Sequence, residues 1–242
     1  MALTYRLVVF DLYGTLLDIS GMAATLSTLL GKDATALLAA WRTAQLERTW
    51  ELNRLARYEP FDRVTAWALA KVAGELDEPL RARLADQWFT VPAHGDAAAT
   101  LRRLAAAGAR TAILSNGTRA MIDRALGAAG LAVDEVRSVE EVRVYKPDPR
   151  VYRMLDDLVP ADSTLFVSSN AFDAEGAKRS GLRVCFIDRR SLEIGGGDPA
   201  GSAGGAGAKA PRGIDRGGAQ PAVAPDFHVR ALADLVDLVQ AP

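Results

Sequence analysis

The stretch Leu7-Val8-Val9-Phe10-Asp11-Leu12-Tyr13-Gly14-Thr15-Leu16 decides the fold. Its first four residues form an apolar run of strand character, and Asp11 follows where that run ends. Gly14 then lets the chain turn away without crowding the carboxylate. Open α/β sheets bind ligands at the carboxyl ends of their parallel strands. The stretch therefore predicts a buried parallel strand with Asp11 as a nucleophile at its carboxyl end.

Length and composition limit the classes of protein to consider. A chain of 242 residues with 49% hydrophobic residues can bury one sizeable core and carry a smaller accessory domain. Basic and acidic residues number 29 and 30 without a long basic run, so we expect small-molecule partners and neither nucleic acid nor membrane. No apolar run approaches the length of a membrane span, which favours a cytoplasmic protein. The single Cys185 lies in a strand-like segment and is expected to be buried and inert.

The order of the expected elements predicts two domains. After the first strand the pattern is helical over residues 34–58, 61–74 and 79–88, and no strand interrupts it. From Gly95 onward helices alternate with short strands, which is typical of βαβ units and a parallel sheet. We expect residues 1–16 and 95–242 to form an α/β core with a Rossmann-like parallel sheet. Residues 17–94 would be a helical cap inserted over the carboxyl edge of that sheet.

The elements expected after Gly95 follow in a regular order. Strands are predicted over residues 110–114, near Val136, and over 164–167 and 183–187. Helices are predicted through Leu101 and Leu104, near residues 121–129, over 148–158 and from Ala171. A short strand and an amphipathic helix over residues 227–239 close the chain.

Residues 195–225 form a separate zone made mostly of Gly, Ala and Pro. We expect a flexible surface loop there, because few large apolar side chains are present to fix it. A glycine-rich phosphate cradle is the alternative at residues 195–197. It is disfavoured because no strand-to-helix context surrounds these glycines and no Gly-Lys-Ser/Thr signature follows.

Four further segments carry a family resemblance in order and spacing. They are Trp41-Arg42, residues 114–118 (Leu-Ser-Asn-Gly-Thr), residues 145–149 (Tyr-Lys-Pro-Asp-Pro) and residues 168–173 (Ser-Ser-Asn-Ala-Phe-Asp). With Asp11 they resemble the haloacid dehalogenase superfamily over nearly the whole chain except residues 195–225. Tyr13, two residues after the aspartate, resembles the L-2-haloacid dehalogenase (type II) branch, since the phosphatases of the superfamily carry a second aspartate there. The resemblance implies the cap-and-core fold, a homodimer, and convergence of these segments around Asp11.

Polar residues that follow the second strand and the proline-rich turn suit an anionic substrate. Ser115 and Asn116 end an apolar strand and precede a helix, so they can point at an anion. By resemblance Ser115 holds the substrate carboxylate. The structural alternative is a helix N-cap, for which Ser115, Asn116 and Thr118 are all suited, and the two functions are compatible. Lys146 lies in a turn stiffened by Pro147 and Pro149, and a positive charge near Asp11 would keep that carboxylate ionised. An exposed loop lysine is the structural alternative.

The segment over residues 168–173 again delivers polar side chains to the sheet edge. Metal-dependent phosphatases of the superfamily place two acidic groups here to hold magnesium, which prefers several oxygen ligands. Only Asp173 is acidic in this segment, and Tyr13 replaces the other acid. We therefore expect neither a required metal nor another cofactor.

Arg42 and a set of apolar side chains are expected to complete the site from the cap. The resemblance implies that Arg42 reaches into the cleft, where its fixed fork of donors suits a halide or a carboxylate. An ordinary surface arginine is the alternative. The apolar pocket around the reacting carbon is expected to comprise Tyr13, Leu46, Phe61 and Phe172. Typical relatives carry tryptophan at the Phe172 position, so the smaller ring here predicts a reshaped pocket.

The resemblance implies hydrolysis of (S)-2-haloacids to (R)-2-hydroxyacids in two steps. Asp11 would attack C2 behind the carbon–halogen bond to form an ester with inversion, while Arg42, Asn116 and Phe172 stabilise the halide. Ser115 and the backbone N–H groups of Leu12 and Tyr13 would hold the carboxylate. A water would then hydrolyse the ester, positioned by the polar residues Thr15, Lys146, Ser168, Asn170 and Asp173.

Three other functions share most of these residues. A phosphatase of the same fold would use Asp11, Ser115 and Lys146, but it would lack the proton donor at Tyr13, a loss of about 10²–10⁴ in rate. Opening of a strained ring such as azetidine-2-carboxylate needs the same aspartate and the same anchor. A binding protein without turnover is the third, since fold and site alone do not prove catalysis.

Overall fold

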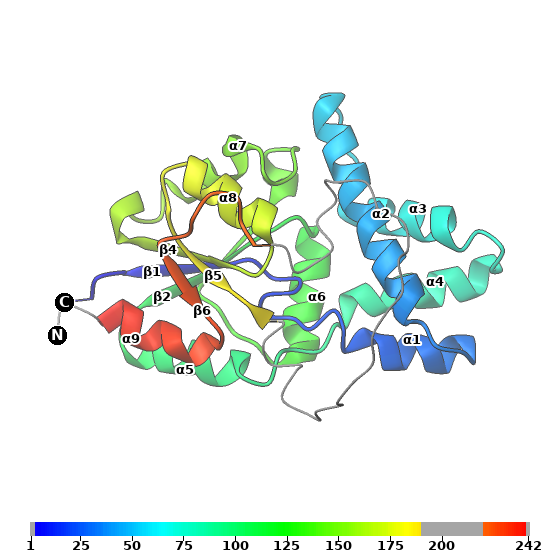
Figure 1. Cartoon of the computed structure of the whole chain (residues 1–242), viewed down its shortest axis with the longest axis horizontal. Coiled ribbons are helices and arrows are strands. Elements are labelled where there is room, and N and C mark those ends of the chain that lie inside the picture. Colours follow the sequence, from blue (N-terminus) through cyan, green and yellow to red (C-terminus); the bar gives the residue numbers. More distant parts are fainter. Residues whose placement is uncertain (1–2, 190–219, 241–242) are drawn as a thin grey trace, which may run out of the picture.

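The computed structural model describes residues 3–189 and 220–240. Its centre is a six-stranded parallel sheet of order β3-β2-β1-β4-β5-β6 (Figure 1). The strands are β1 Leu7–Phe10, β2 Arg110–Ser115, β3 Glu135–Ser138, β4 Thr164–Ser168, β5 Arg183–Ile187 and β6 Phe227–Val229. This arrangement confirms the prediction of an α/β fold with a parallel sheet.

The strand β1 lies in the middle of the sheet because its four residues can be buried on both faces. All four have no solvent exposure, as a central parallel strand requires. From β1 the chain builds outward to β2 and β3 on one side and later returns to β4 on the other. The strand order therefore reverses at β1, which is where doubly wound sheets form their ligand crevice.

Helices cover both faces of the sheet. Helices α5 Ala97–Ala106 and α9 Leu235–Gln240 lie together on one face, and α7 Pro149–Tyr152 and α8 Ala171–Arg179 lie on the other (Figure 1). Helix α6 Arg119–Ala129 follows β2 and begins at Thr118, whose hydroxyl accepts the Met121 N–H at 3.2 Å. It ends at Gly130, which adopts the left-handed conformation.

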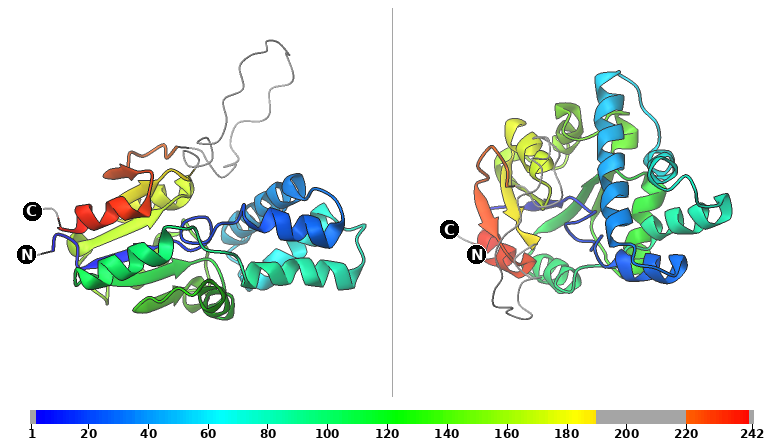
Figure 2. Two further views of the ribbon diagram at one scale, coloured as in Figure 1. Left: turned by 90° about the horizontal axis from the view of Figure 1, so that it is seen from below. Right: turned by 45° about the vertical axis from the view of Figure 1, so that its right-hand side comes forward.

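Helices α1–α4 gather beyond the carboxyl ends of the strands (Figures 1 and 2). They are α1 Met22–Leu30, α2 Thr35–Arg54, α3 Phe61–Val72 and α4 Glu78–Asp86, with a short 3-10 helix at Gln87–Phe89. Buried residues of α2 recur at helical spacing and include Leu38, Trp41 and Leu52. The Trp41 indole donates to the Thr65 carbonyl at 2.8 Å and so ties α2 to α3.

An aromatic chain joins this helical region to the sheet. The rings of Trp41 and Trp88 meet edge to face with centroids 5.6 Å apart, and the Tyr13 ring lies 5.7 Å from Trp88. The Tyr13 hydroxyl also donates to the Trp88 carbonyl at 3.0 Å. Trp41 and Trp88 have no solvent exposure and Tyr13 very little, so these contacts fix the helices relative to the loop that follows β1.

Some boundaries differ from the sequence expectations. Helix α1 was not predicted, and of its residues Met22 and Leu26 are buried. Helix α2 ends at Arg54 rather than near residue 58, since Ala56 adopts a positive φ of 52° that an α-helix cannot accommodate. The helix expected over residues 148–158 is one α-helical turn, α7, followed by a 3-10 turn at Arg153–Leu155.

Other expectations about the chain have mixed outcomes. Cys185 is fully buried, and burial raises the pKa of its thiol to about 12, so the expected inert thiol is confirmed. The glycine-rich stretch at residues 195–225 lies outside the described residues as far as 219. The exact division into a core and a cap at residues 16–17 and 94–95 stays a prediction. Within the described part of the chain, no helix combines the length and apolarity of a membrane span.

Replacing Trp88 with Ala tests the aromatic connection. Removal of a fully buried indole should lower the free energy of unfolding by about 3–5 kcal/mol, because the cavity left between Trp41 and Tyr13 cannot be refilled. The matched control is Trp67→Ala, since Trp67 is 37% exposed and its ring lies beside the side-chain cations of Arg48 and Lys71. That change should cost about 1 kcal/mol at most. Urea denaturation of both variants gives the comparison, and equal losses would contradict this role of Trp88.

Candidate active site

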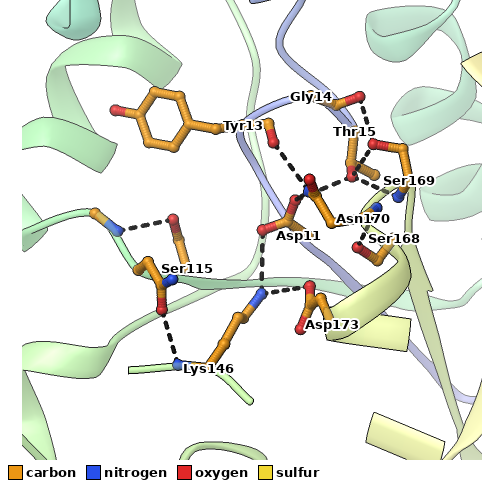
Figure 3. Close-up of polar contacts among 12 residues, drawn as sticks. Asp11, Tyr13, Gly14, Thr15, Ser115, Lys146, Ser168, Ser169, Asn170 and Asp173 are labelled. Carbon is orange, nitrogen blue, oxygen red and sulfur yellow. Dashed lines mark hydrogen bonds and ion pairs between the residues drawn. The ribbon is translucent and has the colours of Figure 1, made fainter. Parts of the chain in front are cut away.

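Three neighbouring strands deliver the polar residues of the site. Asp11 follows β1, Ser115 closes β2, and Ser168 closes β4. Because β2 and β4 flank β1 on opposite sides, these side chains lie at the same edge of the sheet. The Lys146 turn and helix α8 complete the group from one side (Figure 3).

The Asp11 carboxylate is held by three donors. Its Oδ1 accepts from Lys146 Nζ at 3.1 Å, and its Oδ2 accepts from Asn170 Nδ2 at 2.8 Å and from Thr15 Oγ1 at 3.1 Å (Figure 3). The residue is only 6% exposed. A carboxylate fixed in this way and largely removed from water is oriented for attack and poorly solvated.

Lys146 lies between two carboxylates. Its ammonium is 2.8 Å from Asp173 Oδ2 and 3.1 Å from Asp11 Oδ1, and the side chain is 1% exposed. Burial disfavours the charged ammonium, but the charges of Asp11 and Asp173 outweigh it and raise the pKa of Lys146. The structure therefore places Lys146 inside the site, and the alternative of an exposed loop lysine is wrong.

The carboxyl group of Asp173 has a pKa that is shifted toward neutral pH. Burial raises the pKa of Asp173 to about 6, with Lys146 lowering it and the Asp11 charge raising it. The Tyr152 hydroxyl donates to Asp173 Oδ1 at 2.8 Å, while Lys146 holds the other oxygen. A carboxyl group with such a pKa suits the exchange of protons with water.

Gly176 makes the approach of Tyr152 to Asp173 possible. It lies one turn after Asp173 on α8, and a Cβ at this position would collide with the Tyr152 hydroxyl and lie 2.6 Å from Pro147 Cβ. The absent side chain therefore leaves room both for the tyrosine and for the turn that carries Lys146.

The expected carboxylate-binding residues lie on the other side of Asp11. Ser115 is buried, and its Oγ accepts the Gly117 N–H at 3.1 Å. Asn116 Oδ1 accepts the backbone N–H of Lys146 at 3.0 Å, which links the β2 end to the lysine turn. The expected helix N-cap is confirmed at Thr118, and neither Ser115 nor Asn116 caps α6.

Arg42 reaches toward the site from α2. Its guanidinium lies 5.9 Å from the centroid of the Trp88 ring, next to Tyr13. Burial raises the pKa of the Tyr13 phenol, against the lowering effect of the Arg42 charge. Across the same region the Phe172 ring meets Trp50 of α2 edge to face at 5.8 Å.

The other residues predicted for the site are Ser168, Phe61, Leu46 and Leu12. Ser168 Oγ accepts the Asn170 N–H at 3.1 Å and so supports the amide that holds Asp11. Phe61 packs against the Tyr145 ring at 6.0 Å, and Leu46 is buried on α2. The Leu12 side chain is fully buried, which leaves only its backbone for a ligand.

Sequence reasoning missed several supporting residues. Ser169 Oγ donates to the Gly14 carbonyl at 2.7 Å, and its N–H donates to Thr15 Oγ1 at 3.0 Å. Asn53 of α2 binds both the N–H and the carbonyl of Tyr145, immediately before Lys146. Ser169 lies within a motif already noted, but Asn53 and Tyr152 carry no local signal because their partners are distant in sequence.

Metal ligands do not cluster in the described part of the chain. Over residues 3–189 and 220–240, no group of three or more His, Cys, Asp or Glu side chains is placed to hold a metal ion. Asp11 and Asp173 instead share the Lys146 ammonium.

Comparison with known proteins agrees with this geometry. Residues 5–181 match the model of the haloacid dehalogenase-like hydrolases. The chain is 41% identical over 192 residues to (S)-2-haloacid dehalogenase 1 of Pseudomonas sp. strain CBS-3, covering 76% of this chain and 85% of that protein. It is 37% identical over 191 residues to the (S)-2-haloacid dehalogenase of Pseudomonas fluorescens, covering 76% and 84%. The chain belongs to the L-2-haloacid dehalogenase family.

A solved structure of the same family extends the match over nearly the whole chain. The L-2-haloacid dehalogenase of Xanthobacter autotrophicus with chloropropionic acid covalently bound is 33% identical, with a TM-score of 0.81. The match covers 97% of this chain and 98% of that one. Membership of the L-2-haloacid dehalogenase family and the core fold are thereby confirmed, whereas the functions of individual side chains in this chain stay predictions.

Replacing Tyr152 with Phe tests the tuning of Asp173. Loss of the hydroxyl removes a hydrogen bond that favours the ionised carboxylate, so the pKa of Asp173 should be higher in the variant than in the wild type. Carbon-13 NMR of labelled aspartate carboxyls, with Asp173→Asn to assign the signal, measures the shift. The control Tyr5→Phe alters a tyrosine that packs against Phe227 and should leave the midpoint in place. A downward shift in Tyr152→Phe would contradict the assignment.

Proposed function

We propose that the protein hydrolyses (S)-2-haloacids to (R)-2-hydroxyacids through a covalent ester on Asp11. The observation that carries the proposal is the Asp11 carboxylate, fixed by Lys146, Asn170 and Thr15 and shielded from water. The Xanthobacter relative, described with chloropropionic acid covalently bound, and the curated (S)-2-haloacid dehalogenases support the same reaction.

In the first step an Asp11 oxygen attacks C2 of the substrate from the side opposite the halogen. The new oxygen–carbon bond forms as the carbon–halogen bond breaks, and the halide leaves with the bonding electron pair. Arg42, with its charge held near Trp88 and Tyr13, is suited to stabilise the halide together with Asn116 and Phe172. Ser115 and the N–H groups of Leu12 and Tyr13 would hold the substrate carboxylate at the end of β1.

In the second step a water attacks the carbonyl carbon of the Asp11 ester. Asp173 takes a proton from this water, because its raised pKa makes it a better base than an ordinary aspartate. Thr15, Asn170 and Ser168 surround the ester and orient the water. The tetrahedral species then collapses and the ester bond breaks, while Asp173 returns its proton to the leaving oxygen of the 2-hydroxyacid. The remaining proton of the water leaves to solvent as Asp11 becomes a carboxylate again.

The chemistry of these two steps is supplied by side chains alone, and we propose that no metal or organic cofactor takes part. The positive charge that an ionised Asp11 requires is provided by Lys146, which lies within 3.1 Å of both carboxylates. A second cation between the same two carboxylates would be repelled by this ammonium.

Phosphatase activity is disfavoured by Tyr13. The phosphatases of the superfamily carry a proton-donating aspartate at this position. Here the Tyr13 hydroxyl donates to the Trp88 carbonyl, and burial raises the pKa of the phenol. Ring opening of a small cyclic amino acid such as azetidine-2-carboxylate uses the same nucleophile and anchor, and substrate assays distinguish it from halide displacement.

A homodimer and a cytoplasmic location are further parts of the proposal that rest on the family resemblance and on the sequence. Sedimentation of the purified protein tests the first. A mass of one chain, 25.8 kDa, at working concentration would contradict it.

Halide release from each enantiomer of 2-chloropropionate, in the presence of a chelator, tests the reaction. We expect chloride from the L form and none from the D form, because backside attack by a fixed carboxylate accepts one configuration. Asp11→Asn should abolish turnover, whereas Asp123→Asn, which removes a surface partner of Arg119, should leave it unchanged. Magnesium-dependent release of phosphate from p-nitrophenyl phosphate, without chloride from either enantiomer, would contradict the proposal.

Replacing Arg42 with Lys tests the halide site. The charge remains but the fork of donors is lost, and kcat for L-2-chloropropionate should fall about 10²-fold or more, the loss typical of one donor that stabilises a transition state. Arg124→Lys is the matched control, because Arg124 also lies over an aromatic ring, at 4.1 Å from the Phe89 centroid, but on the surface. Similar rates for the wild type and Arg42→Lys would remove Arg42 from the mechanism.

A further inference from the structure

Arg189 is a largely buried arginine that the proposed chemistry does not use. It follows the end of β5, and its side chain is 11% exposed. Its Nη2 donates to the Thr15 carbonyl at 2.7 Å, and its Nη1 donates to both oxygens of Asp96 at 3.0 Å. One guanidinium therefore joins the loop after β1 to the residue that precedes α5.

The contact with Thr15 is made to a residue that itself supports the nucleophile. Thr15 has no solvent exposure, and its hydroxyl donates to Asp11 Oδ2 and accepts the Ser169 N–H. The side chain of Thr15 thus acts on Asp11 while its carbonyl is held by Arg189. A shift of this backbone would move the hydroxyl relative to the carboxylate that it orients.

Asp96, the second partner of Arg189, lies where the chain returns from helices α1–α4 to the sheet. The chain leaves the sheet through residues 16–18 and returns through residues 92–94. These two segments pair antiparallel: the His94 N–H donates to the Leu16 carbonyl at 2.9 Å and the Asp18 N–H to the Pro92 carbonyl at 2.7 Å. Arg189 therefore binds Thr15, which precedes the outgoing segment, and Asp96, which follows the returning segment.

Asp96 is itself fixed on its far side. Its Oδ2 also accepts the Leu232 N–H at 2.8 Å, so the carboxylate is anchored to the segment that leads into α9. Arg189 is therefore tied to a rigid part of the core rather than to a free side chain.

We infer that Arg189 is a positioning residue that holds Thr15, and through it Asp11, in register with the two segments that connect the sheet to helices α1–α4. The inference rests on the proposed function, since its effect is read in dehalogenation. The planar fork of arginine suits the task because it directs separate N–H groups at a carbonyl and at a carboxylate, which a lysine ammonium cannot do in one fixed geometry.

A buried ion pair that contributes only to stability is the competing explanation, because loss of one partner in such a pair is itself destabilising. The two explanations differ in kinetics. A stabilising pair affects the amount of folded enzyme, whereas misplacement of Thr15 slows the chemical steps in molecules that are folded. The useful readout is kcat at saturating substrate, compared with KM, well below the unfolding temperature.

The experiment compares Arg189→Met and Arg189→Lys with the wild type and with Arg183→Met. Arg183 lies at the other end of β5 and pairs with Asp226 at 2.8 Å, so its removal takes an arginine–aspartate pair from the same strand far from Asp11. Chloride release from L-2-chloropropionate gives kcat and KM, and circular dichroism gives the folded fraction. Active-enzyme concentrations are corrected for that fraction.

We expect kcat of Arg189→Met to fall about 10–10²-fold with KM within about twofold of the wild type, a loss in the range caused by small misplacements of reacting groups. Arg189→Lys keeps a charge beside Asp96 and should fold, and its kcat should lie between those of the wild type and Arg189→Met. Arg183→Met should match the wild type in both constants.

Two results separate this inference from the proposed function. A wild-type kcat in folded Arg189→Met overturns the positioning function while leaving dehalogenation intact. If that variant does not fold, a wild-type kcat and KM in Arg189→Lys overturns it instead. Absence of chloride release from the wild type overturns the proposed function, independently of any Arg189 variant.

Discussion

The shared ammonium of Lys146 is the interaction on which the rest of the site depends. Two carboxylates and one ammonium are enclosed at the end of a central strand, and each would be costly to bury alone. Lys146 offsets the cost of burying both carboxylates by binding one oxygen of each, while burial raises the pKa of Asp173 to about 6. The nucleophile and the base of the proposed reaction are thus both held by one side chain.

Much of the surrounding structure serves to place that side chain. Asn116 and Asn53 bind the backbone on either side of the Tyr145–Lys146 bond, from β2 and from α2 respectively. Gly176 leaves room for Tyr152 and for the proline that follows the lysine. The helical region therefore does more than cover the sheet, because α2 supplies Asn53 to the lysine turn and Arg42 to the proposed halide site.

The sequence was most informative where local pattern and chemistry coincide. The apolar run before Asp11 predicts a central strand, and the polar residues after β2 and β4 are brought beside it by the parallel sheet, as the alternation of elements indicates. Tyr152, Asn53 and Arg189 were missed because each acts through a partner distant in sequence, such as Asp173 or Thr15, and only the folded chain brings them together.

Oxygen transfer during a single turnover tests the central claim that Asp11 forms a covalent ester. Enzyme in excess over L-2-chloropropionate is allowed to react in ¹⁸O-labelled water, and the 2-hydroxyacid and the peptide containing Asp11 are analysed by mass spectrometry. The account predicts an unlabelled hydroxyl in the product and ¹⁸O in the Asp11 carboxylate, because water attacks the ester carbonyl. A labelled product hydroxyl with an unlabelled Asp11 would show direct attack of water on C2 and contradict the account.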